Sequence, residues 1–270
     1  AALSCLTPVL PLSDRPERPL CTPEYNREIT CIVDDKRYNS CCNTSCLVTT
    51  PYGLMKPYNM SSARPTFEEA LTQLNVELIK MGATVEKSIM DAVEAFKNHD
   101  EKLAKDIVAK DRIVDDMEKN IEAQCLSLIL RQQPVAGDLR VVSTALKMVT
   151  DMERIGDQAS DIAELIPYLG EGDTYDACSH IPAMAQVAIE MVHGAINAFV
   201  EGDVQKAKEI INKDDIVDDY FDKVKNEVAD LLREKAGSVD VILNFLMIAK
   251  YFERIGDHAE NICEWVEFSK

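Results

Sequence analysis

The sequence predicts an all-α protein built as two tandem antiparallel three-helix bundles, and two observations carry that prediction. From Phe67 onward, apolar residues recur every three or four positions, as on the buried face of a helix. The two ends of this region are also similar in sequence, which indicates an internal duplication. The chain contains only 10 glycines and 6% aromatic residues, and these low values are consistent with a helical protein.

The first half is expected to contain three helices. The apolar spacing predicts one from about Phe67 to Phe96, with Thr66 as its N-cap. Asn98-His99-Asp100 breaks the pattern, and a second helix follows over about 101–131. A turn at Pro134 and Gly137 leads into a third helix over about 138–165.

The second half repeats this plan after a linker at 168–180 that contains Gly170 and Gly172. Helices are expected over about 182–200, 203–235 and 239–268, separated at Gly202-Asp203 and Gly237-Ser238. Connections this short make neighbouring helices antiparallel, so each half is an up-down-up bundle.

Two windows show the duplication residue by residue. Residues 110–116 and 213–219 agree at six of seven positions, with an offset of 103. Residues 153–164 and 253–264 agree at eight of twelve, with an offset of 100. The windows occur in the same order in both halves, so each half carries a D-x-x-x-D helix followed by an E-R-x-x-D helix.

The composition changes near residue 60, which predicts three segments: 1–59, a bundle at 60–169 and a bundle at 181–270. Six of the nine cysteines and seven of the eleven prolines lie before Met60, without helical periodicity. Six cysteines could indicate a disulfide module or a zinc site, but the zinc alternative lacks a C-x-x-C and any His before His99. We expect 1–59 to be an irregular, disordered or non-native extension that the bundles do not need. Cys125, Cys178 and Cys263 are expected to be reduced core residues of a cytoplasmic protein.

Charge restricts the classes of partner. The formal net charge is -18, all of it from residues 60–270, and such a surface repels nucleic acid. The longest apolar run, around 241–249, is interrupted by Asn244 and is too short to span a membrane. We therefore expect no nucleic acid and no membrane insertion.

The repeated carboxylates are the candidate site. In each half an Asp pair and a Glu/Asp pair are spaced four apart, so each pair lies on one helix face. Like charges at this spacing repel, and residues 214–222 hold five Asp with no basic residue between them, which favours a bound cation over a solvated, salt-bridged face. Oxygen-only ligands suit Fe, Mn, Mg or Ca, and zinc less well.

Other motifs are weaker. Arg154 and Arg254 follow the Glu of each pair and are expected to orient it by an ion pair; the alternative is that they bind phosphate together with a metal. Gly156 and Gly256 are expected to allow close helix contact. The single E-x-x-H at Glu190–His193 is one motif where a di-iron oxidase needs two. No phosphate-binding loop or catalytic triad is found, so no catalytic residue is predicted.

Residues 132–140 (QQPVAGDLR) and the two E-R-I-G-D segments make the chain resemble the PhoU family of phosphate-transport accessory proteins, from about Phe67 to Phe268. The resemblance implies two tandem bundles, a homodimer, and multinuclear metal clusters, with iron the first choice and Mn, Mg, Ca or Zn as alternatives. The implied ligands are Asp111, Asp115, Glu153, Asp157, Asp214, Asp218, Glu253 and Asp257. Asp161 is replaced by Asn261 in the second repeat, so an extra ligand is not expected there.

The resemblance also implies a regulator of phosphate homeostasis and not an enzyme. Such proteins repress phosphate uptake and the starvation response by linking the ATPase subunit of the phosphate ABC transporter to a sensor histidine kinase, and they meet the membrane only through these partners. Two alternatives stay open: an accessory domain of another phosphate or metal transporter, and a metal-dependent oxidase or phosphohydrolase.

Overall fold

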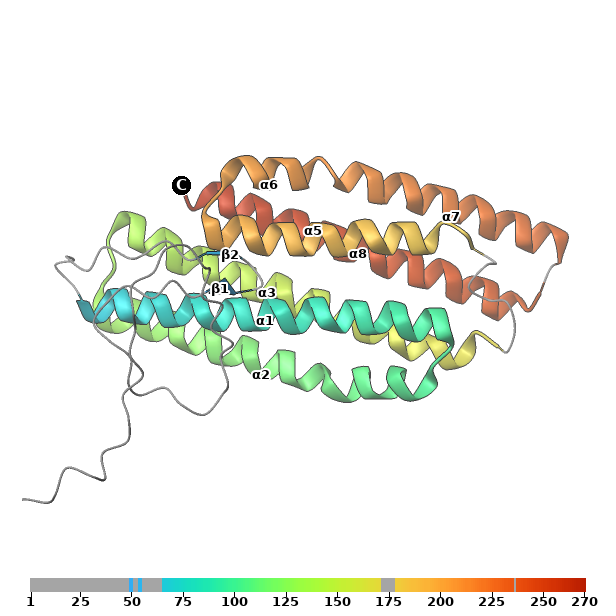
Figure 1. The fold of residues 1–270 in the computed structure, drawn as a ribbon, viewed down its shortest axis with the longest axis horizontal. Coiled ribbons are helices and arrows are strands. Elements are labelled where there is room, and N and C mark those ends of the chain that lie inside the picture. Colours follow the sequence, from blue (N-terminus) through green and yellow to red (C-terminus); the bar gives the residue numbers. More distant parts are fainter. Residues whose placement is uncertain (1–48, 51–52, 55–64, 171–177, 236) are drawn as a thin grey trace, which may run out of the picture. The chain divides into compact units, whose positions relative to one another are not determined.

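A computed structural model describes residues 49–50, 53–54, 65–170, 178–235 and 237–270. Within them the chain is helical apart from one pair of two-residue strands, β1 (Thr49–Thr50) and β2 (Gly53–Leu54), which are antiparallel. The all-α class is therefore confirmed (Figure 1). The rest of the predicted 1–59 extension, and the linker over 171–177, lie outside the described residues.

The first half consists of α1 (Pro65–Asn98), α2 (Glu101–Gln132) and α3 (Ala136–Leu165), followed by a 3-10 turn, η1 (Ile166–Tyr168). Asp100 caps α2, since its Oδ1 accepts hydrogen bonds from the backbone N–H groups of Lys102 and Leu103, both at 3.0 Å. The prediction that Thr66 caps α1 is wrong. The helix begins one residue earlier, at Pro65, whose fixed φ suits a first helical position.

The second half consists of α5 (Ile181–Glu201), α6 (Val204–Ile211), α7 (Asp214–Glu234) and α8 (Val239–Phe268). Asp203 caps α6 as Asp100 caps α2, with Oδ1 accepting from the N–H groups of Gln205 and Lys206. The chain is turned back at Gly202, which has φ 62°.

The predicted single helix over 203–235 is interrupted between α6 and α7, and this corrects the sequence prediction. At the break, the Lys213 N–H donates to the Ile210 carbonyl at 2.8 Å, a tighter turn than in an α-helix. The equivalent position in α2 holds Ala109, a strong helix former, whereas Asn212 is a weak one. Asp214 and Asp215 then occupy the first turn of α7, where the helix dipole favours negative charge.

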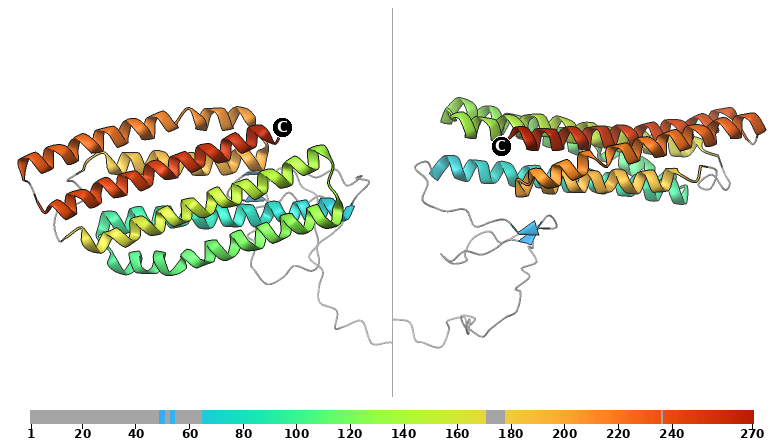
Figure 2. Two further views of the ribbon diagram at one scale, coloured as in Figure 1. Left: turned by 180° about the vertical axis from the view of Figure 1, so that it is seen from behind. Right: turned by 90° about the horizontal axis from the view of Figure 1, so that it is seen from above.

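The two halves share one hydrophobic core. α3 packs extensively on both α2 and α8, and α1 contacts α5 of the other half. Figures 1 and 2 show α3 and α8 running side by side between the outer helices. The rings of Phe96 on α1 and Phe245 on α8 meet edge to face at 6.3 Å, so the core continues from one half into the other.

α5 is the most apolar helix and the only described one that is long and apolar enough to cross a membrane by length and composition. Its residues are mostly buried against α8, α1 and α7. This burial accounts for its composition as that of a core helix.

Candidate metal centre

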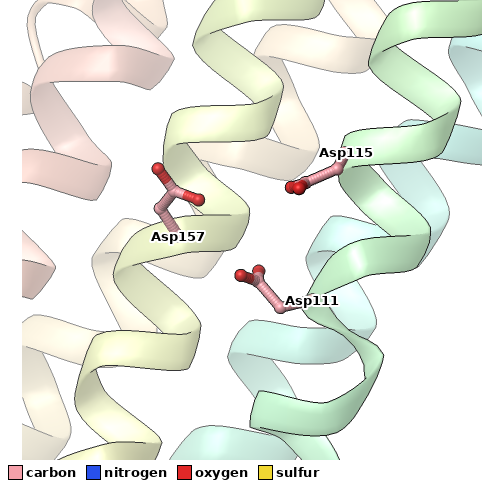
Figure 3. A group of neighbouring side chains, drawn as sticks. All are labelled: Asp111, Asp115 and Asp157. Carbon is pink, nitrogen blue, oxygen red and sulfur yellow. The ribbon is translucent and has the colours of Figure 1, made fainter.

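Three carboxylates of the first half converge between two helices (Figure 3). Asp111 and Asp115 lie on α2, and Asp157 lies on α3. One carboxylate oxygen from each lies within 4.8 Å of the others, and all three residues are partly buried. The spacing of four stacks the first two on one face of α2, and the antiparallel packing of α3 brings the third against them.

Gly156 explains how α3 comes this close to α2. A Cβ atom at this position would lie 3.1 Å from Cγ1 of Val114, a buried residue of α2 between Asp111 and Asp115 in the sequence. Gly156 is buried as well. The glycine thus removes the side chain that would hold the two carboxylate-bearing helices apart, as its mid-helix position suggested.

Glu153 lies one turn before Asp157 and completes the predicted first-half set. Its Oε2 atom is buried and makes no hydrogen bond; the nearest cation, Nε of Arg154, is 3.4 Å away. Arg154 instead donates from Nη1 to Oδ2 of Asp157 at 3.0 Å. Burial and then the neighbouring Asp157 raise the pKa of Glu153 to about 7.

Asp111 is perturbed in the same direction. Burial, followed by the charges of Asp157 and Asp115, raises its pKa to about 6. The pKa of Asp161, one turn beyond Asp157, is also raised, by burial and then by Glu164. Protons or another cation are therefore favoured among these carboxylates near neutral pH.

The second-half residues occupy the matching places on α7 and α8. Asp214 and Asp218 lie on α7, and Glu253 and Asp257 lie on α8. Oδ1 of Asp214 is buried without a hydrogen-bond partner. Burial, and then Glu260 and Asp257, raise its pKa to about 7.

The second half is nevertheless built differently. Asp218 and Asp257 are exposed, whereas Asp115 and Asp157 are partly buried. Nζ of Lys250 donates to Oε2 of Glu253. Its positive charge also opposes the rise in the pKa of Asp218 and of Asp257. No trio of the first-half kind is found among the described carboxylates of α7 and α8.

The donor set can be tested against the cation that the resemblance implies. Carboxylate oxygens are the ligands of hard cations, and two buried oxygens, on Glu153 and Asp214, have no hydrogen-bond donor. Local ion pairs offset the negative charge of the first-half carboxylates only in part. Nζ of Lys119 is 3.9 Å from Asp115, and Nη1 of Arg154 pairs with Asp157. The residues therefore fit an oxygen-bound metal better than a fully salt-bridged face.

Sequence reasoning missed some members of these groups. Glu118 lies one turn beyond Asp115 and influences Glu153, and Glu260 lies near Asp214. Their spacing of three from Asp115 and from Asp257 was available as a signal. The two residues of the E-x-x-H motif have different partners. Glu190 accepts a hydrogen bond from Lys213, at the break between α6 and α7, and Nδ1 of His193 is 3.1 Å from Glu86.

The fold and the repeated carboxylates define a duplicated helical-bundle protein with an acidic group between two helices of each half. The model of the PhoU domain matches residues 78–166 and 181–266. The chain is 41% identical over 202 residues to the phosphate-specific transport system accessory protein PhoU homolog of Clostridium acetobutylicum, covering 74% of this chain and 92% of that one. It is 30% identical to the PhoU protein of Escherichia coli K12, covering 74% and 83%.

Solved structures agree with this assignment. PhoU from Pseudomonas aeruginosa superposes with a TM-score of 0.70 at 32% identity, covering 75% of this chain and 98% of that one. The phosphate transport system regulatory protein PhoU from Streptococcus pneumoniae also gives 0.70, at 26% identity, covering 75% and 96%. The chain belongs to the PhoU family.

Proposed function

We propose that the protein is a cytoplasmic, homodimeric regulator that restrains phosphate uptake and the phosphate-starvation response. It acts as an adaptor between the ATPase subunit of a phosphate ABC transporter and a sensor histidine kinase. Family membership over both repeats carries the proposal, since the relatives are named phosphate-specific transport system accessory proteins. Without a catalytic set among the recognised motifs, it regulates by binding and not by catalysis.

The regulator holds carboxylate-bound metal clusters, with iron as the first candidate. Asp111, Asp115, Glu153 and Asp157 serve as ligands in the first half. The ligands in the second half are Asp214, Asp218, Glu253 and Asp257. The buried oxygens of Glu153 and Asp214, which lack a hydrogen-bond donor, and the raised pKa values support this assignment. A bound cation neutralises the crowded charge and joins α2 to α3 and α7 to α8.

The regulatory role is tested by deleting the gene in the native host and measuring phosphate-starvation genes in phosphate-rich medium. We expect these genes to be switched on, and the intact gene supplied in trans to switch them off. Unchanged expression, with the phosphate transporter intact, would contradict the proposal. A change confined to the uptake of another ion would identify a different transporter as the partner.

The metal assignment is tested by elemental analysis of protein purified without chelators. Replacing Glu153 and Asp157 with Ala should remove about half of the bound metal, because the second half keeps its own ligands. The double variant E69A/E94A is the matched control, since it removes two exposed carboxylates of α1 and should retain all the metal.

Melting curves separate a binding site from a salt-bridged surface. With iron present, E153A/D157A should melt lower than the wild type, because ligand binding stabilises the folded state. With chelator it should melt at the same temperature or higher, because repelling charges are gone. Lower melting in both buffers, together with negligible metal content, would show that the carboxylates form a salt-bridged face.

A further inference from the structure

Among the differences between the two carboxylate groups, two make the second half less negative beside Glu253. With the offset of 103 between α2 and α7, Glu118 corresponds to Phe221. With the offset of 100 between α3 and α8, Thr150 corresponds to Lys250. At these two positions the second half has lost one carboxylate and gained one ammonium group. Other positions differ in the opposite sense, since Ser160 corresponds to Glu260 and Lys119 to Asp222.

Lys250 uses this position to contact the candidate ligands directly. Its Nζ donates to Oε2 of Glu253, whose side chain is only 14% exposed. The same Nζ lies 5.4 Å from the centre of the Phe221 ring, so the aromatic face stands where the first half has a carboxylate. The two substitutions therefore act together, since the ring helps to hold the ammonium group beside Glu253.

The first half has no ammonium group in this place; its Lys119 lies on α2, with Nζ 3.9 Å from Asp115, too far for a hydrogen bond. Thr150 is exposed, and its hydroxyl donates to the Leu146 carbonyl of its own helix. The cation of the first half is a guanidinium group, since Arg154 pairs with Asp157, whereas no ion pair of Arg254 with Glu253 or Asp257 is found among the described residues. Asp111, Asp115 and Asp157 converge despite that pair.

We propose that Lys250 is a built-in counter-ion of the second-half carboxylates, which a metal ion must displace from Glu253, so that the first half loads metal before the second. The inference rests on the proposed metal sites in both halves. An ammonium group and a metal cation compete for the same carboxylate oxygen, and the positive charge also repels the incoming ion. Nζ can leave, because the Lys250 side chain is 42% exposed.

The test measures binding of Mn²⁺ alone to the metal-stripped full chain, with free Mn²⁺ followed by electron paramagnetic resonance. The E153A/D157A background isolates the second half. There Lys250→Thr, which introduces the first-half residue, should lower the Kd for Mn²⁺ about tenfold. Lys250→Arg keeps the charge and should change the Kd by less than about twofold.

The reciprocal change uses the E253A/D257A background, which isolates the first half. Thr150→Lys should raise the Kd for Mn²⁺ about tenfold, and Thr150→Val, which adds no charge, should leave it unchanged. Circular dichroism melts of every variant establish that it is folded. The unmodified chain should bind Mn²⁺ in two phases, the tighter one lost in E153A/D157A.

The outcomes separate this inference from the proposed metal sites. Mn²⁺ binding in both backgrounds with no response to Lys250→Thr would overturn the counter-ion role and leave the sites standing. Binding of Mn²⁺ to both halves with equal affinity would likewise overturn the counter-ion role and leave the metal sites standing. Absence of Mn²⁺ binding in both folded backgrounds would overturn the metal sites themselves, and the inference with them.

Discussion

Asp111 and Asp214 stand at equivalent positions of the two repeats, yet their surroundings differ. Asp111 lies in the middle of the continuous helix α2, whereas Asp214 begins α7 after a break. Asp111 converges with two other carboxylates, and Asp214 lies near a group that already contains the ammonium ion of Lys250. The carboxylate motif is thus the same in both repeats, whereas its surroundings differ. The pairs 118/221 and 150/250 differ in charge, and the pair 109/212 differs in helix propensity.

The largest effect concerns whether the halves are one folding unit. Phe252 on α8 and Met152 on α3 occupy equivalent, fully buried positions. Phe252→Ala should lower the free energy of unfolding by about 3–5 kcal/mol, and Met152→Ala by about 2–5 kcal/mol, because each leaves a cavity. Because the core is shared, urea unfolding should show one transition, shifted by either change. Two transitions, each moved by one variant, would indicate independent bundles.

The second effect compares the glycines at the two helix contacts. A Cβ at Gly156 would meet Cγ1 of Val114 at 3.1 Å, but a Cβ at Gly256 would meet Oδ1 of Asp214 at 3.0 Å. Gly156→Ala should destabilise by about 1–2 kcal/mol, since crowding outweighs the gain in helix propensity. Gly256→Ala should instead lower the metal content of the second half by displacing Asp214. Equal metal content in the two glycine variants would show that Asp214 can shift without consequence.

The third effect is a pH dependence in chelator. The pKa values of Asp111 and Asp214 are raised to about 6 and about 7. Their protonated forms favour the folded state, so this contribution is present below pH of about 4 and is lost as pH rises through 6–7. Asp111→Asn and Asp214→Asn cannot ionise and should melt higher than the wild type at pH 8.

The expected gain is modest because both groups are partly exposed. It should reach at most about 1 kcal/mol, or about 2–4 °C in Tm, and the rise for Asp214→Asn should be centred at the higher pH. The relevant measurement is a series of melts from pH 4 to 8 for each variant. A difference from the wild type that does not change with pH would mean that neither carboxylate has a raised pKa.

The smallest effect concerns the break between α6 and α7. Nζ of Lys213 donates to Oε2 of Glu190 at 3.0 Å, and both side chains are partly exposed, at 36% and 49%. Lys213→Ala should therefore cost about 0.5 kcal/mol or less. Lys110→Ala, at the equivalent position in α2, is the control and should be neutral. A loss above about 2 kcal/mol for Lys213→Ala in chemical denaturation would show that the pair holds the break in place.

Much of the fold could be predicted because its signals are local. The apolar spacing located the six predicted helices, and Asp100 and Gly202-Asp203 marked breaks that the structure confirms. The pairing of carboxylates on one helix face also follows from a spacing of four. The break at Asn212-Lys213 escaped prediction because the apolar spacing continues through it, and only the weak propensity of Asn212 and the acidic start of α7 indicated it.

The candidate site could be predicted as a set of residues but not as a geometry. The carboxylates of α2 and α3 are about 40 residues apart in sequence, and helix packing through Gly156 decides how closely they converge. Lys250 is three residues before Glu253, so the spacing alone predicts their ion pair. Its contact with the Phe221 ring required the packing of α7 against α8.

The sequence by itself determined the helices, the duplication, the PhoU resemblance and the list of repeated carboxylates, because each is encoded in the order or spacing of nearby residues. Only the tertiary structure decided that the halves share a core through α3 and α8, where His258 and Asn261 of one repeat reach Asp151 of the other. It also decided which carboxylate oxygens are buried without a hydrogen-bond donor. Desolvation and charge depend on which side chains packing brings together, and no periodicity along one chain specifies that.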